Sequence, residues 1–152
     1  MVESIQRSFT AKISGCKNLN YWDRLKHLNL YSLQRRRERY MLILVWKIYS
    51  GIIPNSVNIS FQHSLRRGVT CIRPLGSSRY SSINTMRFHS FSSTASALYN
   101  AVPKEIKLSP TLNQFKSALD RFLHKFPDTP PTPGYTGVNG NSLLEWAGSK
   151  LQ

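Results

Sequence analysis

The stretch SLQRRRERYMLILVWKIYSG, residues 32–51, sets an arginine-rich run directly against a block of apolar side chains. Ser32 is a preferred helix N-cap residue, and Gly51 followed by Pro54 is typical of a helix end. The stretch therefore predicts one helix that is basic in its first half and apolar in its second. We expect Leu33, Tyr40, Leu44 and Ile48 to hold this helix in a core.

The arginine-rich half has several possible roles. The apolar block is too short to cross a membrane, because a bilayer core needs about 20 apolar residues and Lys47 interrupts the block. A nuclear-import signal in RRRER is a weakly specific alternative. The remaining two are a solvated helix end and a grip on nucleic-acid phosphates, and Arg35, Arg36, Arg37 and Arg39 favour the grip.

Periodicity and capping residues predict further helices on both sides of this stretch. Each has either an apolar stripe at helical spacing or a capping residue at its start, and Pro and Gly residues separate them. In order they are a helix over 2–16 that stops at Gly15, a short one after Asn20, one over 91–102, one from Thr111 to 126, and a final short one after Ser142.

The middle of the chain has a different texture. Residues 57–61, VNISF, alternate like a strand, and the following Ser-, Arg- and Gly-rich segment has few helix signals. We predict a mainly α protein, a small bundle of about five to six helices with a loop-rich middle that holds a short β-hairpin. The expected parts are a basic helical segment at 1–54, a loop-rich segment with two helices at 55–126, and a Pro/Gly linker with a short helix at 127–152, all in one folding unit.

The charge balance limits the function. The 152 residues hold 21 Lys and Arg against 7 Asp and Glu, a formal net charge of +14. Such an excess favours a polyanionic partner, DNA or RNA, over a neutral one. The candidate phosphate-binding residues are basic side chains that lie in or near predicted helices, or in the basic middle segment. They are Arg7, Lys12, Arg24, Lys26, Arg35, Arg36, Arg37, Arg39, Arg66 and Arg67.

Catalytic and metal chemistry find little support. The seven carboxylates are scattered, and Cys16 and Cys71 have no metal-ligand spacing with any histidine. Glu105 and Lys107 form a Glu-x-Lys pair, but the Pro-Asp that precedes such a pair in metal-dependent nucleases follows it here. Two cysteines and no signal peptide favour a nuclear or cytoplasmic protein over a secreted one. We therefore expect no catalytic residue, no metal and no cofactor.

Four segments taken in order resemble a known family. They are IQRSFTAKISG (5–15), LNYWDRLKHLNLYSLQRRRERYMLILVWKIYSG (19–51), SFSSTASALYNAVPKEIKLSPTLNQFKSALDRFL (90–123) and PGYTGVNGNSLLEW (133–146). Together they resemble the C-terminal thumb and post-thumb region of reverse transcriptases from non-LTR retrotransposons of the jockey-like and LINE-like kind. The most specific positions are Gln6-Arg7, Phe9-Thr10, Arg24-Leu25, Arg35 to Arg37, Tyr99-Asn100 with Pro103, and Phe115-Lys116.

The resemblance implies a helical module that holds the template and primer duplex or the element's RNA. The family's catalytic aspartates have no matching positions in this chain, so the resemblance carries over no polymerase activity. Met1 falls almost inside the first motif, which is typical of a truncated copy. Two readings stay open. One is a non-catalytic nucleic-acid-binding module, and the other is a structural remnant that is unstable without the rest of a reverse transcriptase.

Overall fold

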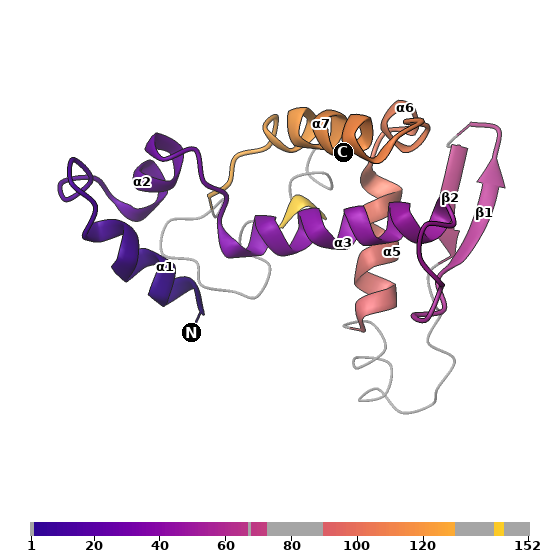
Figure 1. Ribbon diagram of the computed structural model, residues 1–152, viewed down its shortest axis with the longest axis horizontal. Coiled ribbons are helices and arrows are strands. Elements are labelled where there is room, and N and C mark those ends of the chain that lie inside the picture. Colours follow the sequence, from indigo (N-terminus) through magenta and orange to yellow (C-terminus); the bar gives the residue numbers. More distant parts are fainter. Residues whose placement is uncertain (1, 67, 73–89, 130–141, 145–152) are drawn as a thin grey trace. The chain divides into compact units, whose positions relative to one another are not determined.

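The computed structural model describes residues 2–66, 68–72, 90–129 and 142–144 of the chain, and these are mainly helical with one short β-hairpin (Figure 1). This confirms the predicted fold class. The helices are α1 (Val2–Ala11), α2 (Tyr21–His27), α3 (Leu33–Tyr49), α5 (Phe91–Ala101), α6 (Lys104–Lys107) and α7 (Leu112–Leu123), and the strands are β1 (Ser60–Ser64) and β2 (Gly68–Ile72). No helix in the described ranges is long and apolar enough for a membrane span.

The chain divides into two compact units. The terminal unit comprises residues 1–37 and 126–152, and the central unit comprises residues 38–125. The boundary falls inside α3, after Arg37, whereas the sequence placed a boundary at residue 54. The boundary therefore divides the arginine run, because Arg35, Arg36 and Arg37 belong to the terminal unit and Arg39 to the central one.

Local signals set the helices of the terminal unit. The Asn20 side chain accepts hydrogen bonds from the amides of Trp22 and Asp23, each at 3.0 Å, and so caps α2 as predicted. Gly15 has a φ of +81° in the turn that follows α1, a conformation that glycine adopts without strain. α1 contacts α2, but Ile5 and Phe9 of α1 are 65% and 68% exposed. The apolar stripe of α1 is therefore exposed at these two positions.

The hairpin of the central unit lies slightly later than predicted. β1 begins at Ser60 rather than at residue 57, and it pairs antiparallel with β2 so that Phe61 lies opposite Cys71. Val69 and Cys71 of β2 are buried, and both α5 and α6 contact this strand. The Asn100 side chain completes the strand, because it accepts from the Cys71 amide at 2.7 Å and donates to the Cys71 carbonyl at 2.8 Å.

The core of the central unit is apolar and aromatic. Trp46 of α3 stacks on Phe115 of α7 with ring centroids 5.1 Å apart, and its indole N–H donates to the Lys107 carbonyl at 3.2 Å. α7 begins at the predicted N-cap Thr111, whose side chain accepts from the Gln114 amide. The buried apolar residues are Leu42, Ile43, Val45, Trp46, Ile48, Ile59, Val69, Cys71, Ala95, Leu98, Tyr99, Val102, Phe115, Leu119 and Leu123.

Candidate nucleic-acid interface

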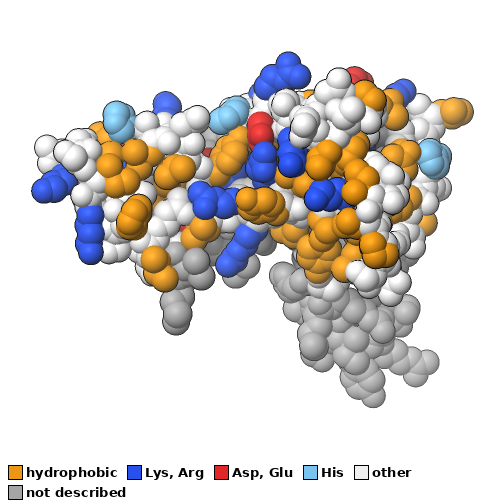
Figure 2. All heavy atoms as spheres, in the orientation of Figure 1, with side chains coloured by type: hydrophobic (Ala, Val, Ile, Leu, Met, Phe, Trp, Pro, Cys, Tyr) orange, Lys and Arg blue, Asp and Glu red, His pale blue; other side chains and the backbone are white. Residues whose placement is uncertain are grey.

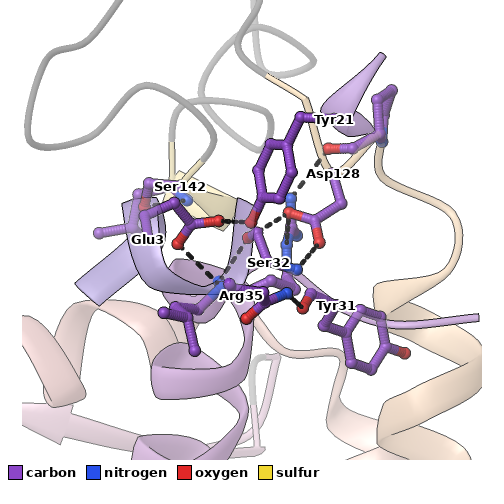
Figure 3. A network of polar contacts seen from close by, with 11 residues as sticks. Glu3, Tyr21, Tyr31, Ser32, Arg35, Asp128 and Ser142 are labelled. Atoms are coloured by element: carbon purple, nitrogen blue, oxygen red, sulfur yellow. Dashed lines mark hydrogen bonds and ion pairs between the residues drawn. The ribbon is translucent and has the colours of Figure 1, made fainter. Parts of the chain in front are cut away.

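Arg35 is not part of an exposed basic surface. Its side chain is fully buried in the terminal unit, where it donates to the Pro127 carbonyl at 3.0 Å and lies 3.7 Å from the Asp128 carboxylate (Figure 3). Taking a guanidinium out of water is costly unless it is paired and hydrogen-bonded. Arg35 is therefore a structural tie between the start of α3 and the segment after α7, and the expectation that it projects into solvent is wrong.

Asp128 also caps α3. Its carboxylate accepts from the Ser32 amide at 2.6 Å and from the Ser32 hydroxyl at 2.7 Å, and the same hydroxyl accepts from the Arg35 amide at 3.1 Å (Figure 3). The predicted N-cap role of Ser32 is confirmed. A carboxylate at a helix N-terminus is favoured both by the unpaired amides and by the helix dipole.

A second carboxylate approaches the same helix end. Glu3 of α1 accepts from the Leu33 amide at 3.1 Å and from the Tyr21 hydroxyl (Figure 3). Burial, followed by the hydrogen bond to Glu3, raises the pKa of Tyr21 above its usual range. Both carboxylates thus serve to join α1, α2 and the 127–128 segment to the first turn of α3.

Arg24 is also internal. It was expected to point away from the core, but it is 8% exposed and donates to the Leu19 carbonyl at 2.7 Å and to the Arg7 carbonyl at 3.4 Å. These hydrogen bonds give partners to a carbonyl of α1 and to a carbonyl of the turn before α2. Arg24 therefore holds α2 against α1, and the expectation that it lies on the surface is wrong.

Arg39, in the central unit, already has an anionic partner. Its guanidinium makes a two-point contact with Asp120 of α7, at 2.5 and 2.8 Å. This fork-to-carboxylate geometry is the one that a phosphate would otherwise use. The next residue, Tyr40, was expected in the core but is 61% exposed, whereas Trp46 is buried. At this point α3 therefore exposes Tyr40, whose ring centroid lies 6.0 Å from the guanidinium carbon of Arg39.

The remaining cations of the terminal unit lie at its surface. Arg7, Lys12, Lys26 and Arg37 are exposed and Arg36 is half-buried. Within the described residues none of the five has an ion-pair partner. Lys17, which was not among the predicted site residues, is exposed as well. The signal that could have found it is its place in a polar turn beside Gly15 and Asn18.

Arg7 lies against an aromatic ring. Its guanidinium lies over the Tyr21 ring at 4.9 Å from the centroid, and the hydroxyl of that ring is held by Glu3. Stacking on an aromatic ring restricts the guanidinium while its N–H groups still face solvent. Less side-chain entropy is then lost when it binds an anion.

The acidic residues of the terminal unit do not neutralise this surface. Residues 1–37 hold eight Lys and Arg against Glu3 and Asp23. Glu3 is bound to Tyr21 and the α3 amide, and Asp23 accepts from the Asn20 side chain within the cap of α2. The face drawn in Figure 2 carries many blue Lys and Arg side chains and few red acidic ones. The surface charge of this unit is therefore largely uncompensated.

One of the predicted residues, Arg66, lies in the turn between β1 and β2 of the central unit. Arg66 is exposed there. Arg67 lies outside the described residues. Arg66 belongs to the central unit and is not one of the cations of the terminal unit.

The central unit contains a buried lysine. Lys107 is 2% exposed, donates from Nζ to the Val69 carbonyl at 3.0 Å, and lies 5.0 Å from the centroid of the Tyr99 ring. Burial lowers the pKa of Lys107 below its usual value and raises the pKa of the nearby Cys71 thiol to about 11. Glu105, by contrast, is exposed, so the Glu-x-Lys pair does not converge on one site.

Metal ligands do not gather in the described parts of the chain, where no group of three or more His, Cys, Asp or Glu side chains is placed to hold an ion. Cys16 and Cys71 are buried free thiols in different units.

No protein-family model, curated protein or solved structure matches this chain.

Proposed function

We propose that the chain is a non-catalytic nucleic-acid-binding fragment of a retrotransposon RNA-directed DNA polymerase, acting inside the cell, in the nucleus or cytoplasm. It grips a template and primer duplex, or the element's RNA, through phosphate contacts. The proposal joins the ordered resemblance in the sequence to the charge of the terminal unit, and it assigns no chemical step to any residue.

The observation that carries the proposal is a set of cations without acidic partners. Arg7, Lys12, Lys26, Arg36 and Arg37 have no ion pair within the described residues, while the carboxylates of the same unit are engaged in internal hydrogen bonds. Uncompensated charge of this kind costs self-repulsion, which a polyanion relieves. Arginine forks and lysine ammonium groups at a surface bind phosphate oxygens without reading base sequence.

The test is the salt dependence of binding to duplex DNA and duplex RNA of arbitrary sequence. Each neutralised phosphate of B-form DNA contributes a slope of about −0.9 to a plot of log binding constant against log salt. If the five cations each neutralise one phosphate, the slope should lie at roughly −4 to −5. Binding that is insensitive to salt, or no binding at low salt, would contradict the proposal.

A second candidate is favoured by the exposed apolar side chains of α1. Ile5 and Phe9, one helical turn apart, are 65% and 68% exposed. They fit a structural remnant whose apolar face packed on upstream parts of a reverse transcriptase. A thermal melt of the isolated chain separates the two, because a remnant that needs its missing partner should melt without a cooperative transition.

A further inference from the structure

The turn between α1 and α2 holds an open depression whose lining is polar and positively charged. Ser14, Gly15, Lys17 and Asn18 line it, and its volume is about 290 Å³. All four residues are exposed, and all belong to the terminal unit. An added Cβ on Gly15 would meet nothing within 4 Å, so the space above this residue is open. The turn is the loop that joins the two helices at the start of the chain (Figure 1).

The backbone of the turn has unused donors. The amides of Ile13, Cys16 and Leu19 donate to the carbonyls of Thr10, Ile13 and Cys16, at 3.4, 3.1 and 3.2 Å. Within the described part of the chain, the amides of the four lining residues donate to no acceptor. Gly15 has a φ of +81°. Such a left-handed residue in a turn allows successive N–H groups to face the same side, whereas in a strand they point to alternate sides.

The side chains add donors of the same kind. The Ser14 hydroxyl, the Asn18 amide and the Lys17 ammonium form no hydrogen bond or ion pair within the described residues. The carbonyls of Thr10, Ile13 and Cys16 accept the turn's own amides, so fewer acceptors face an incoming anion. Unpaired backbone N–H groups beside a lysine make a concavity that favours an anion.

We propose that this turn, named here the 14–18 turn, is a phosphate-binding site. Lys17 supplies the charge, and the backbone amides of Gly15, Lys17 and Asn18 supply hydrogen bonds to the phosphate oxygens. The inference rests on the proposed function in taking phosphate as the ligand, and it deepens that function by placing one contact. The same chemistry suits a phosphodiester of a nucleic-acid backbone and a free phosphate group.

The test is a titration of the uniformly ¹⁵N-labelled full chain with inorganic phosphate at constant ionic strength. Saturable shifts of the Gly15, Lys17 and Asn18 amide signals are expected. Lys17→Gln should weaken phosphate binding about tenfold, since it removes one charge-assisted contact. The matched control is Lys125→Gln, an exposed lysine of the central unit that does not line the depression, which should leave the affinity within about twofold. No saturable shift, or equal losses in both variants, would overturn the site.

A second titration uses a short duplex of DNA and identifies the source of the phosphate. If the same amides shift with the duplex, the turn contacts the nucleic-acid backbone. If they shift with inorganic phosphate alone, the site stands and its ligand is a free phosphate group. A duplex that binds with the expected salt slope while these amides stay unchanged in both titrations overturns the site and leaves the proposed function intact. Phosphate-induced shifts of these amides without any duplex binding would uphold the site and contradict the proposed function.

Discussion

The terminal unit and the central unit differ in the contacts that stabilise each of them internally. In the terminal unit, buried polar side chains join helix ends to neighbouring segments by hydrogen bonds. Arg24, Ser32 and Arg35 are examples. The central unit buries aromatic and aliphatic side chains from α3, α5, α7 and β2. Hydrogen bonds contribute modestly when made and cost much when one partner is lost, whereas apolar burial scales with area. The unit with the uncompensated surface cations therefore depends most on individual internal contacts.

The first prediction tests the apolar side of this comparison. Phe115→Ala removes a fully buried ring that stacks on Trp46. The substitution should lower the free energy of unfolding by about 3–5 kcal/mol, because it leaves a cavity in the core. Denaturant unfolding measures the change. Leu108→Ala, at a residue that is 57% exposed, is the control and should cost less than about 1 kcal/mol.

The second prediction tests the polar side. Asp128→Ala leaves the Arg35 guanidinium buried without its carboxylate. It also removes the acceptor of the Ser32 amide and hydroxyl at the start of α3. We expect a loss of about 2–4 kcal/mol, with amide protection lost first in α1 and α2. Hydrogen exchange measures the protection of each helix. Glu105→Ala removes an exposed carboxylate from the central unit as the charge-matched control, and equal loss of protection in the two variants would contradict the comparison.

The third prediction concerns the one buried lysine of the central unit. Burial lowers the folded-state pKa of Lys107 below its unfolded value of 10.5. Between these two values the unfolded chain binds more protons, so the stability of the wild type should rise with pH relative to Lys107→Met. The slope cannot exceed about 1.4 kcal/mol per pH unit for one proton. Denaturant unfolding of both proteins from neutral pH to pH near 10 measures it, and a constant difference between them would be the contrary outcome.

The helix ends could be predicted from sequence because capping is local. Asn20, Ser32 and Thr111 act within three residues of themselves, and each was identified from residue type and spacing. α6 was missed because four residues cannot show a helical period. Helical spacing alone also did not reveal that Ile5 and Phe9 are exposed. An apolar stripe predicts an amphipathic helix, but it does not indicate whether another segment packs on that face.

The candidate site was less predictable because the contacts that engage two of its arginines join residues far apart in the sequence. Arg35 lies 93 positions before Asp128 and Arg39 lies 81 positions before Asp120, so no local pattern marks these arginines as paired. Their neighbours, the half-buried Arg36 and the exposed Arg37, look the same in sequence. The practical consequence is that replacing all four arginines together would disturb both units, and binding experiments should spare Arg35 and Arg39.

The last prediction has the smallest effect on stability and bears most directly on function. Arg7, Lys12, Lys26 and Arg37 are exposed cations of the terminal unit. Replacing all four with Gln should change the free energy of unfolding by less than about 0.5 kcal/mol per site. A matched variant replaces the same number of surface cations in the central unit with Gln. Its residues are the exposed Lys104, Arg121 and Lys125 and the half-buried Lys116.

The decisive measurement is the salt dependence of duplex binding by these two variants beside the wild type. If the terminal unit grips the phosphates, its variant should lose about 3 to 4 from the magnitude of the slope, and the central variant less than about 1. Equal losses, or a larger loss in the central variant, would contradict the assignment of the grip to the terminal unit.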